Sequence, residues 1–264
     1  MVTDAEALSA ALMWGLDATA IRAALAKADG QEIASGKVFS AQSSSALAIN
    51  AFGAFLHRPQ GLPPLPGTED LGWPALSVRI EAKVPFPWTG GRTPNLDVLI
   101  ETKTALIGVE SKRYEPFDSH GQPSWSETYW KHDWGVEMAR YAAMRDASRD
   151  GHAGFRHLEE AQLVKHAFGL LAATSPGRPC AGKTPVLLLL RAEPRTNRGG
   201  KPLAESIHAD VAAEVERFRC AVEGDRVRFG ALTYRALLAS WLAADDRHLR
   251  AHAAALTAFF DGDM

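Results

Sequence analysis

The chain has 264 residues, of which 46% are hydrophobic, and its 29 Lys and Arg against 31 Asp and Glu give a formal net charge of −2. This composition is typical of a soluble globular protein and argues against a generally basic nucleic-acid-binding surface, because broad phosphate contact requires an excess of cations. The chain has no run of about 18 apolar residues and no charged-then-apolar leader, so we expect a cytoplasmic protein without a membrane span. Its two cysteines, Cys180 and Cys220, lack the spacing of a disulfide framework or a zinc cluster.

The N-terminal part of the chain is predicted to be helical. Residues 5–28 fit two short helices, interrupted at Gly15 and closed by Gly30, which make up an N-terminal helical extension over residues 1–30. A serine-rich cap then leads into an apolar helix from about Ser44. Residues 57–74, HRPQGLPPLPGTEDLGWP, are too rich in Pro and Gly for regular structure and are predicted to form a long connector.

A period of two begins after this connector. In residues 76–84 apolar side chains alternate with polar ones, which predicts a strand with one solvated face. Residues 96–101 and 105–112 are predicted to be two further strands that form a hairpin. The later elements are expected to be a mostly helical aromatic segment (124–147), a helix (158–173), an apolar strand (184–194), a helix (204–222), a short strand (226–232) and terminal helices.

This order of elements predicts a single domain of the α/β class over residues 1–264. The expected architecture is a mixed β-sheet flanked by helices, with extra helices at the N- and C-terminal ends. The run VLLLL, residues 186–190, is expected to be a central strand, because an all-apolar strand needs both of its faces covered.

The predicted hairpin contains charged residues inside apolar strands: Asp97 in the first strand, and Glu110 and Lys112 in the second. If Thr102 and Lys103 form a two-residue turn, Asp97 lies opposite Gly108, whose missing side chain leaves room beside it. Glu110 is then the diagonal neighbour, at about 7–8 Å. A three-residue turn would instead place Asp97 opposite Val109 and send Glu110 to the other face.

Two carboxylates in an apolar hairpin repel each other and lose hydration, and a divalent cation would offset both costs. Ligands that are all oxygen atoms favour Mg²⁺ or Mn²⁺ over zinc. The alternative is a solvated strand face that carries an acid and a lysine without function, since an isolated E-x-K pattern occurs by chance in many strands.

Thr93-Pro94-Asn95-Leu96-Asp97, followed by Gly108-Val109-Glu110-Ser111-Lys112, resembles the split motif of the PD-(D/E)xK nuclease superfamily, whose fold is restriction-endonuclease-like. VESKRYEPF, with SSSALAINAFGAFL upstream, is similar to a poorly characterised bacterial branch of these proteins. The resemblance covers roughly residues 43–190, and it implies a nuclease-like core over about residues 43–235.

By this resemblance, Asp97 and Glu110 would hold Mg²⁺ (or Mn²⁺) with help from the carbonyl oxygen of Ser111. Lys112 would orient or activate the attacking water and stabilise charge on the phosphate. The implied activity is metal-dependent hydrolysis of phosphodiester bonds in nucleic acid, expected to be DNA, by an endo- or exodeoxyribonuclease. A cut through both strands would favour a homodimer.

Gln162 and His166 lie four residues apart on one face of the predicted helix 158–173. Several nucleases of the superfamily place a glutamine and then a tyrosine at this spacing, so the resemblance implies a catalytic role for Gln162, with His166 in the place of the tyrosine. For His166 a solvated helical stripe is the competing interpretation.

Other residues have two interpretations each. Glu81 is either an extra acid of the site or, as we expect, part of a solvated face beside Arg79 and Lys83. Glu115 either orients Lys112 or follows the turn, and the sequence does not choose. The aromatic segment is expected to pack in the core through Trp130, Trp134, Met138 and Tyr141. A basic loop would either contact phosphates or be an ordinary exposed loop; its cations are Arg191, Arg195, Arg198 and Lys201.

Two alternatives to a nuclease remain. One is a catalytically inactive nuclease-fold module that binds nucleic acid or protein, and the other is a hydrolase that uses the two acids as general acid and base. Walker, G-x-G-x-x-G, G-x-S-x-G and H-E-x-x-H sequences do not occur, so several other enzyme classes lack their simplest motifs.

Overall fold

The computed structural model describes residues 4–28, 36–40, 42–84, 86–88, 93, 95–118, 121, 123–260 and 264. Its strands form one mixed sheet in the order β1 (Ser77–Lys83), β2 (Asn95–Glu101), β3 (Ala105–Lys112), β4 (Thr184–Arg191) and β5 (Arg228–Thr233). β1, β2 and β3 pair antiparallel, whereas β3, β4 and β5 pair parallel. The expected α/β fold with a mixed sheet is confirmed.

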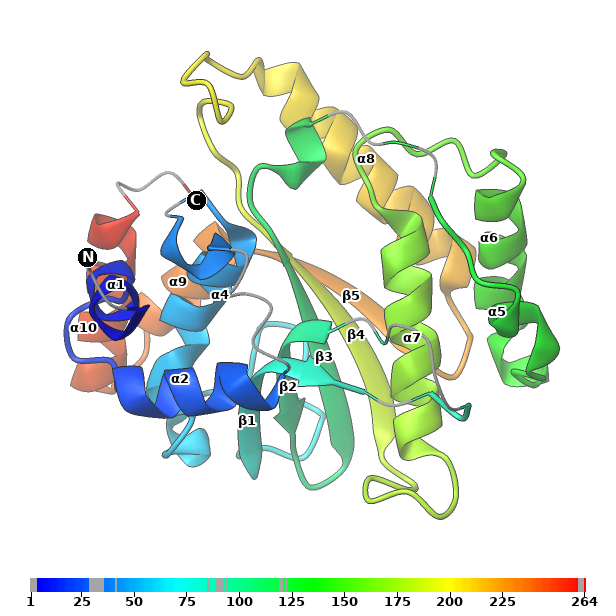
Figure 1. Cartoon of the computed structure of the whole chain (residues 1–264), viewed down its shortest axis with the longest axis horizontal. Helices are drawn as coiled ribbons and strands as arrows, with labels where there is room; N and C mark the ends of the chain where they lie inside the picture. Colours follow the sequence, from blue (N-terminus) through cyan, green and yellow to red (C-terminus); the bar gives the residue numbers. More distant parts are fainter. Residues whose placement is uncertain are drawn as a thin grey trace.

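Helices cover both faces of this sheet (Figure 1). On one side lie α1 (Asp4–Ala11), α2 (Ala18–Lys27), α4 (Ser44–Phe52), α9 (Tyr234–Leu242) and α10 (Arg247–Phe259). On the other side lie α5 (Thr128–Lys131), α6 (Ala139–Arg149), α7 (Glu160–Thr174) and α8 (Glu205–Val222). Short 3₁₀ turns connect them: η1 (Lys37–Phe39), η2 (Gly53–Phe55), η3 (Pro59–Gly61), η4 (Glu115–Phe117) and η5 (Val136–Met138). Among the helices described, none is both long and apolar enough to cross a membrane.

Each face of the sheet has its own hydrophobic core. Val98, Ile107 and Leu188 pack with α4, α9 and α10, whereas Leu99 and Leu187 pack with α7 and α8. A third cluster joins Ile21 and Leu25 of α2 to residues of α4 and β1, so the N-terminal helices pack against the sheet layer. The predicted end of the N-terminal extension at Gly30 lies outside the described residues.

α4 is an apolar helix because it is enclosed on nearly all sides. Ser43 caps it by accepting a hydrogen bond from the N–H of Ala46 at 3.4 Å, as the serine-rich sequence predicted. Seven consecutive residues, Ala46–Phe52, are buried. This packing directs the N-terminal end of α4, with Ser44 and Ser45, toward β2 and β3.

β4 is an interior strand, as its apolar sequence predicted. Seven of its residues, Pro185–Arg191, are buried, because helices cover both faces and β3 and β5 cover both edges. The middle position of the sheet, however, belongs to β3. The strand that bears Glu110 and Lys112 is therefore also interior, and seven of its eight residues are buried.

The predicted exposure of Glu81 is wrong. Arg79 and Lys83 are exposed as expected, but Glu81 is 4% exposed and has a backbone φ of 47°. The register pairs Ile80 with Val98 and Ala82 with Leu96, and it skips Glu81 between them. A positive φ is costly for a residue with a side chain, and here it turns the carboxylate away from the solvated face.

The hairpin turn lies one residue later than the two-residue turn considered above. Leu99 pairs with Gly108 and Glu101 with Leu106, and the N–H of Thr102 donates to the carbonyl of Ala105 at 3.0 Å, so Lys103 and Thr104 form the turn. The resulting register differs by two residues from that prediction. A shift of two keeps every side chain of β3 on its expected face, whereas a three-residue turn would not.

Gly108 does not leave room beside Asp97. A Cβ atom at this position would lie 2.7 Å from Leu96 Cδ1 and 3.0 Å from Leu170 Cδ1. The glycine therefore allows α7 to pack closely against the hairpin. Both leucines are buried, so the site has little freedom to relax.

Gly108→Ala is expected to lower the free energy of unfolding by about 1–2 kcal/mol, because the added methyl overpacks a closed core. Urea unfolding followed by circular dichroism measures the change. Gly61→Ala is the control, since its nearest neighbour would be Phe55 Cδ1 at 3.9 Å. Equal stability of the two variants would contradict the packing role of Gly108.

The aromatic segment is less helical than predicted. It divides into α5, η5 and α6, with Gly135 at φ 79° before η5. The packing prediction for its residues is confirmed: Trp134 stacks on Phe168 with ring centroids 4.0 Å apart, and Met138 and Tyr141 are 0% exposed. Trp130 is half-buried beneath Arg149, whose guanidinium lies 4.3 Å from its ring centroid.

Candidate active site

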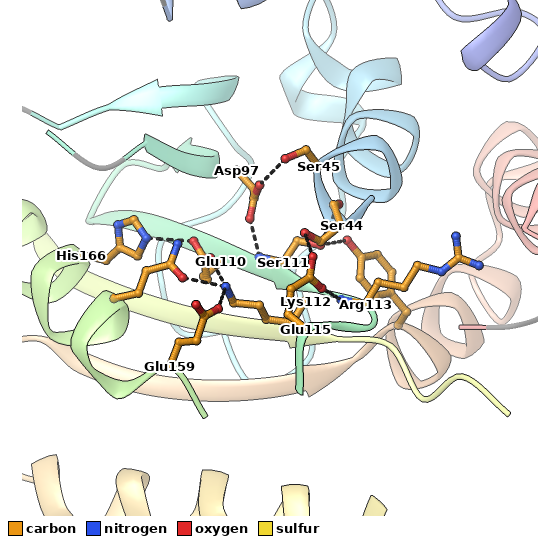
Figure 2. Close-up of polar contacts among 12 residues, drawn as sticks. Ser44, Ser45, Asp97, Glu110, Ser111, Lys112, Arg113, Glu115, Glu159 and His166 are labelled. Atoms are coloured by element: carbon orange, nitrogen blue, oxygen red, sulfur yellow. Dashed lines mark hydrogen bonds and ion pairs between the residues drawn. The ribbon is translucent and has the colours of Figure 1, made fainter. Parts of the chain in front are cut away.

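Asp97 lies where β2 and β3 separate. Val98 and Val109 are the last pair of the ladder, and beyond them the N–H of Ser111 donates to Asp97 Oδ2 at 2.6 Å (Figure 2). The hydroxyl of Ser45 donates to Asp97 Oδ1 at 3.4 Å. The side chain thus reaches toward β3 and α4 instead of following Leu99 onto the α7 face.

The alternation of β2 is interrupted at the same point. Leu96 packs in the same cluster as Leu99, although Val98, which regular alternation would place on the face of Leu96, packs with α4. Regular alternation along the strand would place Asp97 on the same face as Leu99 and Glu101, and the structure contradicts this expectation from the sequence. Pro94, which precedes this region in the predicted motif, lies outside the described residues.

The surroundings of Asp97 disfavour its negative charge. Burial, then the nearby charges of Glu110 and Glu81, raise the pKa of Asp97 well above its usual value, and the hydrogen bond from Ser111 only partly opposes them. Two carboxylates, Glu81 of β1 and Glu110 of β3, therefore repel the negative charge of Asp97 on β2. Such a group is stabilised either by a proton or by a cation.

Glu110 is held in the opposite electrostatic situation. It is 3% exposed, and its two oxygens face Lys112 Nζ at 3.0 Å and His166 Nε2 at 2.9 Å (Figure 2). Burial would raise the pKa of Glu110, but Lys112 and His166 outweigh it, so the pKa is lowered. Glu110 is accordingly an ionised carboxylate in the α7 face of the sheet.

Lys112 is surrounded by acceptors. Its Nζ donates to Glu110, to Gln162 Oε1 at 2.6 Å and to Glu159 Oε2. Burial alone would lower the pKa of Lys112, but Glu110 and Glu159 raise it above its usual value. The lysine is a charged point donor at the end of β3.

Glu159 is a site residue that the sequence analysis missed. It directly precedes α7, three residues before Gln162, so the two side chains leave the same side of the helix start. In the sequence, an acid three residues before Gln162 is the available signal. The pairing of Glu159 with Lys112, at the end of β3, could not be inferred from that spacing.

His166 belongs to the site, and the solvated-stripe interpretation is wrong. It is 2% exposed and lies one turn after Gln162 on α7, which brings its Nε2 to Glu110. A buried histidine here anchors the second oxygen of that carboxylate.

Ser111 and Glu115 connect the site to other elements. The hydroxyl of Ser111 contacts the carbonyl of Ser44 at 3.1 Å and the hydroxyl of Tyr234 at 2.8 Å. Glu115 accepts from the hydroxyl of Ser44 at 2.9 Å and from the N–H of Arg113 at 2.8 Å. Of the two interpretations of Glu115, these contacts favour a residue that stabilises the turn after β3.

The basic loop is only partly available to an anion. Arg191 pairs with Glu193 at 3.2 Å and is buried. Arg198 pairs with Glu115 at 3.2 Å and with Asp118 at 3.0 Å. These acids neutralise two of the four cations proposed as phosphate contacts.

A cleft of about 1030 Å³ approaches the site from the α7 side. Glu159 and Gln162, which both contact Lys112, are part of its wall. Its cations and acids are mixed: Arg156, Lys165, Asp118 and Glu160 also contribute to the wall. The cleft therefore offers an approach to Lys112 without a strongly basic surface.

The oxygen atoms of the site would suit Mg²⁺ or Mn²⁺, although the described part of the chain contains no gathered group of three His, Cys, Asp or Glu side chains able to hold a metal. Asp97 is a carboxyl group that a proton or a cation would stabilise. Glu110 already contacts Lys112 and His166, but a carboxylate has about four lone-pair directions and can keep these contacts while binding a cation. The donor set fits a hard cation whose remaining ligands are main-chain or water oxygens.

Comparison with known proteins gives one family. The family model described as Restriction Endonuclease associating with ARP matches residues 6–259. No curated protein and no solved structure matches the chain.

Proposed function

The chain belongs to the family described as Restriction Endonuclease associating with ARP, and from this membership we propose that it is a metal-dependent nuclease that hydrolyses phosphodiester bonds in nucleic acid, with DNA as the expected substrate. The observation that carries the proposal is the juxtaposition of Asp97, Glu110 and Lys112 where β2 and β3 separate. The surroundings of Asp97 disfavour its negative charge, and Lys112, whose side chain is 12% exposed, is a cation on the next strand.

Asp97 and Glu110 would hold Mg²⁺ or Mn²⁺, with the carbonyl oxygen of Ser111 as a third ligand. The ion would lower the pKa of a bound water and neutralise charge that develops on the phosphate. His166 would keep the carboxylate of Glu110 in place, and Ser45 would do the same for Asp97. Lys112 would orient the attacking water and donate to a phosphate oxygen, with Gln162 fixing its direction.

Nucleic acid is the proposed partner, and the mixed charge of the cleft favours recognition of few phosphates at a time over wrapping of a long duplex. A double-strand cut by one such site per chain would need two copies. A homodimer is therefore part of the proposal for double-strand cleavage only.

A general acid/base hydrolase is the second candidate, because the pKa of Asp97 is raised while that of Glu110 is lowered. Two carboxyl groups with pKa values pushed apart are the usual arrangement for an acid and a base. This candidate predicts activity in the presence of a chelator.

Calorimetry with Mg²⁺ and Mn²⁺, followed by cleavage assays on linear and circular DNA and on RNA, tests the proposal. Metal binding together with cleavage that stops on addition of EDTA is the expected result. Hydrolysis that continues in EDTA would favour the acid/base hydrolase. Nucleic-acid binding without cleavage at any metal concentration would favour the inactive binding module.

A further inference from the structure

The ammonium group of Lys112 has no donor left for a substrate. A protonated lysine carries three N–H donors. In this structure they face three acceptors, on Glu110, Glu159 and Gln162. Any phosphate or water that Lys112 is to contact must therefore replace one of these acceptors.

Glu110 and Gln162 are poorly placed to leave. Glu110 is buried, and its other oxygen is held by His166 at 2.9 Å. Gln162 projects from within α7, one turn before His166, and it carries no charge that a phosphate would repel. Gln162 is therefore compatible with a bound anion next to Lys112, and Glu110 is kept in place by its contact with His166.

Glu159 has the properties of a replaceable acceptor. Its side chain is 36% exposed and lies in the wall of the cleft that approaches Lys112. It precedes α7 but makes no side-chain cap to the helix, so Lys112 is its contact in the site. Its backbone is fixed nearby, because the N–H groups of His157 and Leu158 donate to the carboxylate of Glu214 at 2.8 and 3.1 Å. The side chain can therefore turn into the cleft without moving the helix.

We propose that the carboxylate of Glu159 occupies, on Lys112, the position of a phosphate oxygen of the nucleic-acid substrate, and that substrate binding displaces it into the cleft. This inference rests on the proposed nuclease function and assigns a substrate-binding role to one further residue. Carboxylate and phosphate oxygens are both anionic acceptors for an ammonium group, so one replaces the other without leaving the largely enclosed Lys112 cation unpaired.

The exchange has a consequence for affinity. Only in a fraction of the molecules has Glu159 left Lys112 so that its ammonium group can bind substrate. The apparent affinity for substrate is reduced in proportion to that fraction. Glu159 thus weakens substrate binding and favours ligands that bring their own anionic oxygen. It should affect KM and leave the chemical step nearly unchanged.

Glu159→Gln is expected to bind a fluorescent DNA duplex or single strand about twofold to fivefold more tightly than wild type, as an ion pair of this exposure is worth about 1 kcal/mol or less. Fluorescence anisotropy in Ca²⁺ measures binding, and steady-state cleavage in Mg²⁺ should show a lower KM with kcat changed by less than about twofold. Asp118→Asn is the matched control, because it removes the same charge from the same cleft wall and Asp118 pairs with Arg198 instead of Lys112.

A second comparison isolates the contact. In a Lys112→Met background, Glu159→Gln should no longer tighten binding, because the exchange requires the ammonium group. An equal gain from Asp118→Asn, or a gain that persists without Lys112, would mean a general charge effect and would overturn the inference. A loss of kcat with unchanged KM would overturn it as well, since Glu159 would then act in the chemical step.

These outcomes are distinct from failure of the proposed function. If wild type cleaves DNA and Glu159→Gln binds no more tightly than the control, only the role of Glu159 is overturned. If neither wild type nor the variants bind any nucleic acid, the proposed function fails and the inference that rests on it fails too.

Discussion

Asp97→Asn should reduce the rate of metal-dependent cleavage by about 10³-fold or more, which corresponds to about 4 kcal/mol of activation free energy. The amide keeps an oxygen acceptor for the N–H of Ser111, which lies 2.6 Å from Asp97 Oδ2, so the local structure should persist. The substitution removes the negative charge that would bind the metal ion. Calorimetry with Mn²⁺ and cleavage of a plasmid substrate would measure both effects.

The same substitution should stabilise the metal-free protein by about 1 kcal/mol at pH 7, because a half-buried charge near two other acids is removed. The sign follows from the raised pKa. In the unfolded chain the pKa of Asp97 is about 3.9, and in the folded protein it is higher. Wild type therefore loses stability as pH rises from about 4 through the folded pKa, and the advantage of the variant should vanish below about pH 4.

Thermal unfolding between pH 3.5 and 8, with and without Mg²⁺, would measure this advantage. Mg²⁺ should raise the midpoint of wild type and leave that of Asp97→Asn unchanged, since only the form that binds the ion is stabilised by it. Glu101→Gln is a suitable control, because Glu101 lies at the other end of β2 and pairs with Lys183 at 3.2 Å. A variant less stable than wild type at pH 7 would mean that the charge of Asp97 is not a cost to the fold.

Lys112→Met should reduce cleavage by about 10²–10⁴-fold, the range expected when a group that transfers or positions a proton is removed. It should also lower stability by about 2–3 kcal/mol, because the buried carboxylate of Glu110 loses its nearest cation. His166 remains in contact with Glu110, which limits the loss.

Loss of activity must be separated from loss of fold for this variant. Lys112→Arg keeps a cation near Glu110 and should recover most of the stability, but the planar guanidinium cannot reproduce the point donor, and cleavage should remain at least about 10²-fold reduced. Lys183→Met is the matched control, since the side chains of Lys183 and Lys112 are 15% and 12% exposed and both pair with a glutamate. Full cleavage by Lys112→Met would remove Lys112 from the mechanism.

Much of the candidate site follows from local periodicity. Glu110 and Lys112 share a face because side chains alternate along a strand, and Gln162 and His166 share a face because they are one helical turn apart. The structure brings these two pairs together across β3 and α7. The sequence also shows that Glu110 and Lys112 are charged residues within an apolar segment. The fold class could be predicted as well, because an all-apolar run such as VLLLL requires a strand that is covered on both faces.

Tertiary structure decided the features that depend on exact backbone geometry or on a distant partner. The turn at Lys103 and Thr104 moved Asp97 relative to β3, and the interruption of β2 turned its side chain toward Ser45 and Ser111. The positive φ that buries Glu81 has no periodic signal, since glutamate is not the residue expected in that conformation.

Contacts between distant segments were likewise beyond the sequence. Glu159 and Lys112 are separated by 47 positions in the chain, and the pairing of Arg198 with Glu115 neutralises one cation of a loop whose composition is basic. Residue type and spacing therefore determined which groups could perform the chemistry. The folded chain decided which of them meet, because burial and pairing are set by neighbours that sequence spacing does not specify.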